Sequence, residues 1–84
     1  MKSKKWKCEN ADGSIVDIEV GDTVKIIHNL IEGDVSKEFL EEHQNEVTLV
    51  ITKLNSRNIE GRVDGTWSTY LLLYPKNIID IRKI

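Results

Sequence analysis

The chain has 84 residues, 14 of them acidic and 12 basic, and a formal net charge of −2. A chain of this length builds a single core that buries about 60% of the unfolded surface, so we predict one domain over residues 1–84 with a modest free energy of unfolding. The charge balance argues against a protein held to nucleic acid chiefly by phosphate neutralisation. The lone cysteine, Cys8, excludes an internal disulfide and a multi-cysteine zinc site, and it indicates a reducing compartment.

The location predicted from the sequence is the cytoplasm. The basic start of the chain is not followed by the apolar run of a signal peptide, and no stretch approaches transmembrane length. We therefore expect no membrane partner. Frequent Ile, Asn and Lys residues suit an AT-rich bacterial or phage genome.

The first predicted element is a β-hairpin around residues 11–13, which read Ala-Asp-Gly. A loop of these three residues, with the glycine in the left-handed conformation, places apolar side chains opposite one another on one face and opposite charges on the other. The predicted pairs are Trp6 with Ile18, Cys8 with Val16, Lys5 with Glu19 and Lys7 with Asp17. A two-residue loop would bury lysine side chains, so we predict the three-residue loop.

From residue 14 onward the sequence reads as short strands joined by turns. Runs of β-branched and apolar residues are separated by clusters of Gly, Asn, Asp and Pro. The predicted strands are residues 14–20, 23–28, 46–54, 59–63, 66–74 and 78–84. We therefore predict a mostly β fold, a small barrel of five to six antiparallel strands.

One short helix is predicted inside the long loop between the second and third of these strands. Over residues 35–43, either Asp34 or Ser36 supplies an N-cap, and Phe39 and Leu40 share one helical face. Loops of this length in compact domains are usually either functional or disordered. Two interpretations stay open: a lid that closes one end of the barrel with its apolar face, or an acidic binding element.

A second hairpin is predicted around residues 63–65, with Gly61 opposite Trp67. Continued alternation turns three side chains inward: Trp67, Leu71 and Leu73. It leaves three on the outer face: Tyr70, Leu72 and Tyr74. On this interpretation Trp67→Ala truncates the core and costs about 3–5 kcal/mol. A two-residue loop would reverse the faces and place Arg62 beside Trp67 on the surface.

The sequence from about residue 20 to the end resembles SH3-like barrels. Gly21-Asp22-Thr23-Val24 matches the "G-D-x-V" strand that opens these barrels, and Pro75-Lys-Asn77 occupies the 3₁₀ turn that begins at a proline. Asp64-Gly-Thr-Trp67 is similar to a strand of KOW and Tudor-type barrels and of small bacterial and phage SH3-like proteins. The resemblance implies an SH3-like barrel that serves as a binding module.

Two surfaces are candidate binding sites. In signalling SH3 domains an acidic loop, a tryptophan and a tyrosine beside the 3₁₀ proline bind proline-rich peptides, and Glu41, Glu42, Trp67 and Tyr74 occupy comparable places, although the paired-tyrosine motif is lacking. The candidate protein or peptide site is Tyr70, Leu72, Tyr74, Glu41 and Glu42. The alternative nucleic-acid face is Lys4, Lys5, Lys7, Arg82 and Lys83. We predict a protein-interaction module; the alternatives are a nucleic-acid-binding accessory protein or a structural component of a bacterial or phage complex.

Groups that could support catalysis are few. Cys8, His28 and His43 supply a thiol and two imidazoles, but nothing local predicts that the three meet. The acidic residues lack the spacing of a calcium loop, and the glycines stand singly and form no phosphate cradle. We therefore predict no enzyme activity, no metal and no cofactor.

Overall fold

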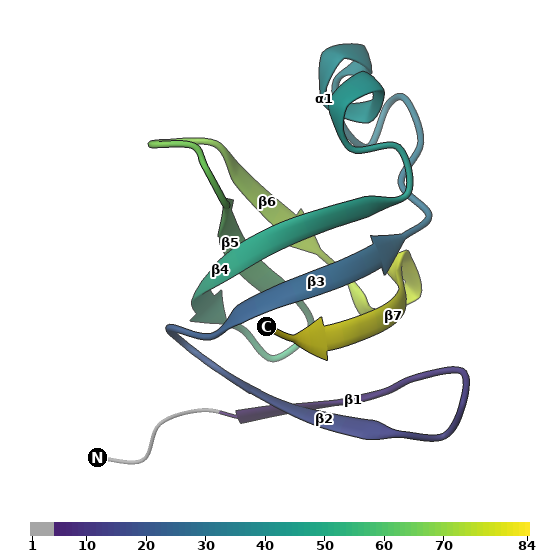
Figure 1. Ribbon diagram of the computed structural model, residues 1–84, viewed down its shortest axis with the longest axis vertical. Coiled ribbons are helices and arrows are strands. Elements are labelled where there is room, and N and C mark those ends of the chain that lie inside the picture. The colour runs from purple at the N-terminus through teal and green to yellow at the C-terminus, as the bar shows by residue number, and fades with distance from the viewer. Residues whose placement is uncertain (1–4) are drawn as a thin grey trace.

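The structure, a computed structural model that describes residues 5–84, is mostly β (Figure 1). Within these residues seven strands form two antiparallel sheets. The smaller sheet pairs β1 (Lys5–Glu9) with β2 (Ile15–Glu19). The larger sheet has the order β6-β5-β4-β3-β7 and consists of β3 (Thr23–His28), β4 (Glu46–Leu54), β5 (Ile59–Val63), β6 (Tyr70–Leu73) and β7 (Ile78–Lys83).

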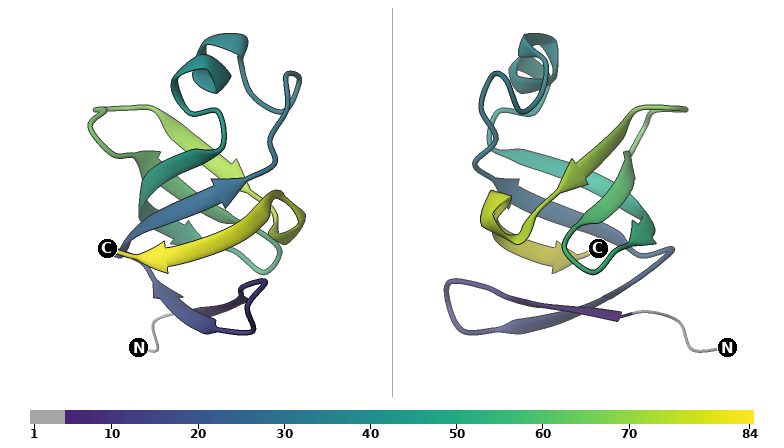
Figure 2. Two further views of the ribbon diagram at one scale, coloured as in Figure 1. Left: turned by 45° about the vertical axis from the view of Figure 1, so that its right-hand side comes forward. Right: turned by 180° about the vertical axis from the view of Figure 1, so that it is seen from behind.

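The larger sheet curls around the core without closing into a barrel. Its two edges, β6 and β7, are joined by the 3₁₀ turn η1 (Pro75–Asn77) but are not paired with each other. The β1–β2 hairpin lies at one end of the molecule and the helix α1 (Lys37–Glu42) at the other (Figures 1 and 2). Instead of one barrel of five to six strands, the structure has a five-stranded sheet and a separate two-stranded sheet formed by the predicted N-terminal hairpin.

One aliphatic core holds the two sheets together. Alternate residues along each strand of the larger sheet turn inward, as expected for strands with one buried face. The side chains with the least exposure are Ile18, Val24, Ile26, Val47, Leu49, Ile51, Ile59, Val63, Leu73 and Ile81. The half-buried Trp6, Cys8 and Val16 of the hairpin pack against the same cluster, so the hairpin belongs to the core.

The predicted register of the first hairpin is confirmed. Trp6 pairs with Ile18 and Cys8 with Val16, while Lys5 pairs with Glu19 and Lys7 with Asp17. Gly13 has a φ of 87°, and its N–H donates to the carbonyl of Asn10 at 2.9 Å. The Lys5 ammonium lies 3.3 Å from the Glu19 carboxylate. Alternation and charge pairing were sufficient to predict this element.

The predicted register of the second hairpin is wrong. Gly61 lies opposite Leu71 rather than Trp67, and β6 begins only at Tyr70. Residues 64–69 form a longer loop in which Thr66 turns back on Val63, its N–H and hydroxyl donating to that carbonyl at 3.1 and 2.6 Å. These local bonds close the loop, and the ladder between β5 and β6 lies beyond it, so the partner of Gly61 is four residues later than predicted. The faces predicted for residues 70–74 are confirmed, because Leu71 and Leu73 are buried while Tyr70, Leu72 and Tyr74 are exposed.

Gly61 is required for a reason other than a covering tryptophan. A β-carbon at this position would lie 2.9 Å from the carbonyl oxygen of Val50 and 3.0 Å from the β-carbon of Leu49. Strand β4 therefore passes too close for a side chain.

Trp67 is the main correction to the predicted core, and it reverses the expected effect of truncation. Its side chain is 97% exposed at the tip of the loop of residues 64–69. We now expect Trp67→Ala to change the free energy of unfolding by no more than about 0.5 kcal/mol, as for surface substitutions generally. Urea denaturation followed by circular dichroism measures this. A loss of about 3 kcal/mol would show that the side chain packs against the core after all.

The short helix is confirmed with tighter bounds. It covers Lys37–Glu42, and the hydroxyl of its N-cap, Ser36, accepts the Phe39 N–H at 3.2 Å. Phe39 and Leu40 are half-buried and pack against the core cluster, which supports the interpretation of this segment as a lid over one end of the core.

Candidate functional site

The long loop between β3 and β4 is fastened at its base by His28. This side chain is only 3% exposed, and its Nδ1 accepts the Leu30 N–H at 3.2 Å. A neutral imidazole has one donor and one acceptor nitrogen, so Nε2 carries the proton and donates to the His43 carbonyl at 2.8 Å. Burial lowers the pKa of His28, while the bond to His43 acts in the opposite sense. Neutral His28 therefore joins the two ends of the loop.

A second set of bonds fastens the start of the loop to η1. The Asn29 N–H donates to the Asn77 carbonyl at 3.2 Å, and the Asn29 side-chain amide donates to the Lys76 carbonyl at 2.9 Å. The Asn77 side chain in turn accepts the Tyr74 N–H at 3.3 Å. These contacts hold the first residues of the loop beside the end of β6.

A groove of about 300 Å³ lies where this loop meets β6. Leu30, Asp34 and Val35 line it on the loop side. The side chains that line it from the strand and its end are Tyr70, Leu71, Leu72, Tyr74 and Asn77. Because the lining includes both inward-facing and outward-facing residues of β6, the groove follows the edge of the strand rather than one of its faces.

Three of the five residues predicted to bind a protein partner line the groove. Tyr70, Leu72 and Tyr74 line it, and they are 60%, 40% and 42% exposed. Glu41 and Glu42 lie on the exposed surface of α1, and the carboxylate in the groove lining is that of Asp34. Trp67, the other SH3-like candidate, lies with Arg62 and Thr66 at a different hollow, on the loop between β5 and β6.

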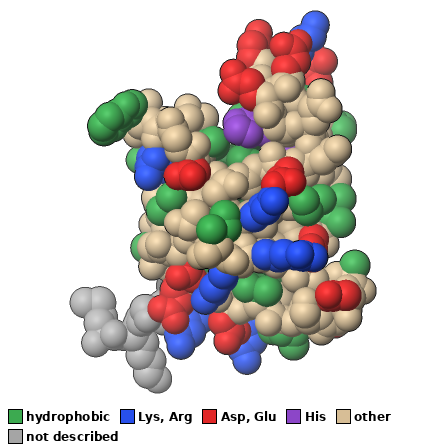
Figure 3. Space-filling view, viewed as in Figure 1, with side chains coloured by type: hydrophobic (Ala, Val, Ile, Leu, Met, Phe, Trp, Pro, Cys, Tyr) green, Lys and Arg blue, Asp and Glu red, His purple; other side chains and the backbone are tan. Residues whose placement is uncertain are grey.

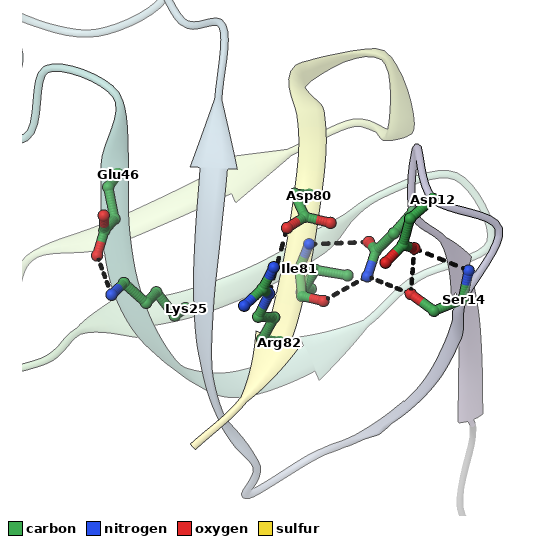
Figure 4. A network of polar contacts seen from close by, with 8 residues as sticks. Asp12, Ser14, Lys25, Glu46, Asp80, Ile81 and Arg82 are labelled. Atoms are coloured by element: carbon green, nitrogen blue, oxygen red, sulfur yellow. Dashed lines mark hydrogen bonds and ion pairs between the residues drawn. The ribbon is translucent and has the colours of Figure 1, made fainter.

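The opposite edge of the larger sheet, strand β7, is hydrogen-bonded to a residue of the first hairpin. The side-chain amide of Asn10, a buried residue of the first hairpin, accepts the Ile81 N–H at 2.9 Å and donates to the Ile81 carbonyl at 2.9 Å. Figure 4 shows these bonds meeting β7 at Ile81. Asn10 thus satisfies the main chain of β7 as a neighbouring strand would. Sequence reasoning missed this residue because its partner is distant along the chain.

The predicted nucleic-acid face is electrostatically mixed. Lys4 lies outside the described residues. Three of the others pair with acids: Lys5 with Glu19 at 3.3 Å, Arg82 with Asp80 at 3.4 Å and Lys83 with Asp22 at 3.2 Å. Red and blue side chains alternate over the lower part of Figure 3. This arrangement leaves less uncompensated positive charge for phosphates than the sequence count implies.

The cysteine and the two histidines occupy two different places in the fold. Cys8 lies half-buried in β1, and burial raises its thiol pKa, which disfavours the reactive thiolate. His28 and His43 meet at the base of the loop. Over residues 5–84 there is no group of three or more His, Cys, Asp or Glu side chains placed to hold a metal ion. Nor do these residues include a helix long and apolar enough to cross a membrane.

Comparisons with known proteins found no significant match to any protein-family model, curated protein or solved structure. The case for a function therefore depends on the geometry and charge of the chain itself.

Proposed function

We propose that this protein is a non-catalytic interaction module that binds an extended segment of a partner protein in the groove between the loop of residues 30–35 and β6. The composition of this groove is the main observation that supports the proposal. It combines two exposed tyrosines and a partly exposed leucine with aliphatic walls and one carboxylate, a composition that suits a peptide with both apolar and basic residues.

The charge around the groove favours a basic segment. Lys37 is the single lysine or arginine between positions 31 and 46, whereas the acidic residues there are Glu32, Asp34, Glu38, Glu41, Glu42 and Glu46. Of these, Glu46 is paired with Lys25 at 2.7 Å. The helix end of Figure 3 is accordingly dominated by red side chains. Such a field attracts positively charged partners and repels acidic ones.

The order of the elements supports the same proposal through the resemblance to SH3-like barrels. A long loop separates the first two strands of the larger sheet, and η1 precedes the last strand. We place the module in the cytoplasm, where an unpaired thiol such as Cys8 stays reduced. The partner would be a protein of the same compartment.

Selection from a random peptide library displayed on phage tests the proposal. We expect enriched peptides to bind the wild-type protein and Trp67→Ala, an exposed aromatic outside the groove, with equal affinity. Tyr74→Ala should weaken the same peptides about tenfold, the loss typical of a buried aromatic contact. Equal binding to all three proteins would contradict the proposal. Oligonucleotide binding that weakens steeply with salt would instead favour the nucleic-acid face.

A further inference from the structure

The edge of β6 that lines the groove presents free main-chain groups. The Val63 N–H donates to the Thr69 carbonyl at 2.7 Å, and Gly61 pairs with Leu71 two residues further on. Hydrogen-bonded and non-hydrogen-bonded pairs alternate along an antiparallel ladder. Leu71 and Leu73 therefore turn their N–H and carbonyl groups toward β5, whereas Tyr70 and Leu72 turn theirs toward the groove.

The two edges of the larger sheet differ in this respect. At β7 the amide of Asn10 bonds to the main chain of Ile81. At β6 the neighbour within residues 5–84 is β5 alone, so its outer side has no strand over it in the part of the chain that the structure describes. An open edge is a ready template for one more strand.

We propose that the partner segment binds by adding to β6 as a further strand, paired with the main chain of Tyr70 and Leu72, and that it carries a basic residue opposite Asp34. This inference rests on the proposed function and specifies the conformation and chemistry of the ligand. Main-chain bonds give such a strand part of its affinity, and contacts with the loop wall add to it. Its alternate side chains meet the aliphatic loop wall, Leu30 and Val35, which gives it specificity.

A second copy of the chain is a poorer occupant of this edge. Pairing two β6 edges would bring two acidic loops to one interface, and like charges there disfavour association. Asp34 is better placed as an ion-pair partner for a foreign lysine or arginine. It has no ion pair within residues 5–84, and one of its oxygens, Oδ2, accepts the Ile31 N–H at 3.2 Å.

Backbone methylation of the ligand tests the inference on the unaltered protein. The probe is the most enriched phage-display peptide, synthesised in two forms with N-methyl groups on alternate amides, one form blocking each edge of the strand. We expect one form to lose affinity about tenfold or more and the other to match the unmethylated peptide, because only one edge faces β6.

Variants of the protein give the complementary test. Leu72→Pro removes an N–H that does not bond to β5, so the strand can tolerate it as an edge position, and binding should fall about tenfold. Leu72→Ala is the matched control that keeps the N–H. Asp34→Asn keeps an acceptor for Ile31 but loses the charge, and should weaken the peptide about two- to fivefold at low salt, whereas the matched change Asp17→Asn, on the exposed face of the first hairpin, should not.

The outcomes separate the inference from the proposed function. A peptide that depends on Tyr74 but is indifferent to methylation on either edge would overturn strand addition and leave the groove as a binding site. Failure to enrich any peptide that distinguishes Tyr74→Ala from the wild type would overturn both. A concentration-dependent dimer lost in Leu72→Pro would show that a second copy takes the edge, and would overturn the basic partner.

Discussion

Replacing Asn10 with alanine is expected to lower the free energy of unfolding by about 2–4 kcal/mol, because it leaves two buried main-chain groups without partners. Ile81 is fully buried, and both its N–H and its carbonyl bond to the Asn10 amide. A domain of this size has a free energy of unfolding of about 5 kcal/mol, so the loss is a large fraction of the total. Urea denaturation followed by circular dichroism measures it.

A neighbouring variant distinguishes the role of the amide from that of the loop around it. Ser14→Ala removes the contact between Asn10 Nδ2 and the Ser14 hydroxyl, at 3.1 Å, but keeps both bonds to Ile81. We expect it to cost about 1 kcal/mol or less. Trp6 reports detachment of the hairpin by fluorescence, because its indole N–H donates to the Asn55 carbonyl at 2.8 Å. Equal losses in Asn10→Ala and Ser14→Ala would refute a specific role for the β7 edge.

The two hairpins show what alternation can and cannot predict. In the first, a one-residue slip would bury charge, so the pattern of Lys5 to Glu9 against Ile15 to Glu19 permits one register. In the second, residues 66–69 read Thr-Trp-Ser-Thr, and alternation gives no reason to end the strand before them. The bonds of Thr66 to Val63, together with the Arg62 guanidinium on the Thr66 carbonyl, decide the outcome.

The site was predictable only on its strand side. The outward positions of Tyr70, Leu72 and Tyr74 follow from the period of two, because the longer loop shifts the partner of Gly61 by an even number of residues, whereas a two-residue loop would have reversed the faces. The opposite wall of the groove depends on the path of the long loop. His28 and Asn29 fix this path by bonding to His43 and Asn77, which lie 15 and 48 residues away in the sequence. The sequence showed an acidic segment, but only the folded loop shows that its groove carboxylate is Asp34 rather than Glu41 or Glu42.

Acidification is expected to destabilise the protein through His28. The unfolded residue takes up a proton near its ordinary pKa of 6.5, whereas burial lowers the pKa in the folded state. Between those two pKa values the unfolded chain binds more protons, so the free energy of unfolding falls as the pH drops below about 6.5 and levels off below the folded pKa. Urea denaturation at a series of pH values from about 7.5 to 5.5 measures the slope, in a range where most carboxylates stay ionised.

The surroundings of His28 supply both the cause and the controls. The Nδ1 of His28 accepts the Leu30 N–H, so a proton on Nδ1 would place two N–H groups against each other. A positive charge on His43 lowers the pKa of His28 further. The Glu42 carboxylate lies 3.9 Å from the His43 ring, so it faces His43 rather than His28. His43→Gln keeps the carbonyl that His28 bonds and should retain the slope attributable to His28, whereas His28→Gln should lose it. An unchanged slope in His28→Gln would show that other groups govern the acid response.

Protonation of His28 should also affect the groove. His28 bonds to Leu30, which lines the groove on the loop side, and to His43 at the end of the loop. Protonation breaks the bond from Leu30 and frees that wall from its fixed position. Peptide affinity measured by titration calorimetry is therefore expected to fall over the pH range in which folded His28 takes up its proton. The peptide must contain no histidine, so that its own charge stays constant. Affinity that stays level while stability falls would mean that the strand edge, rather than the loop wall, supplies the binding energy.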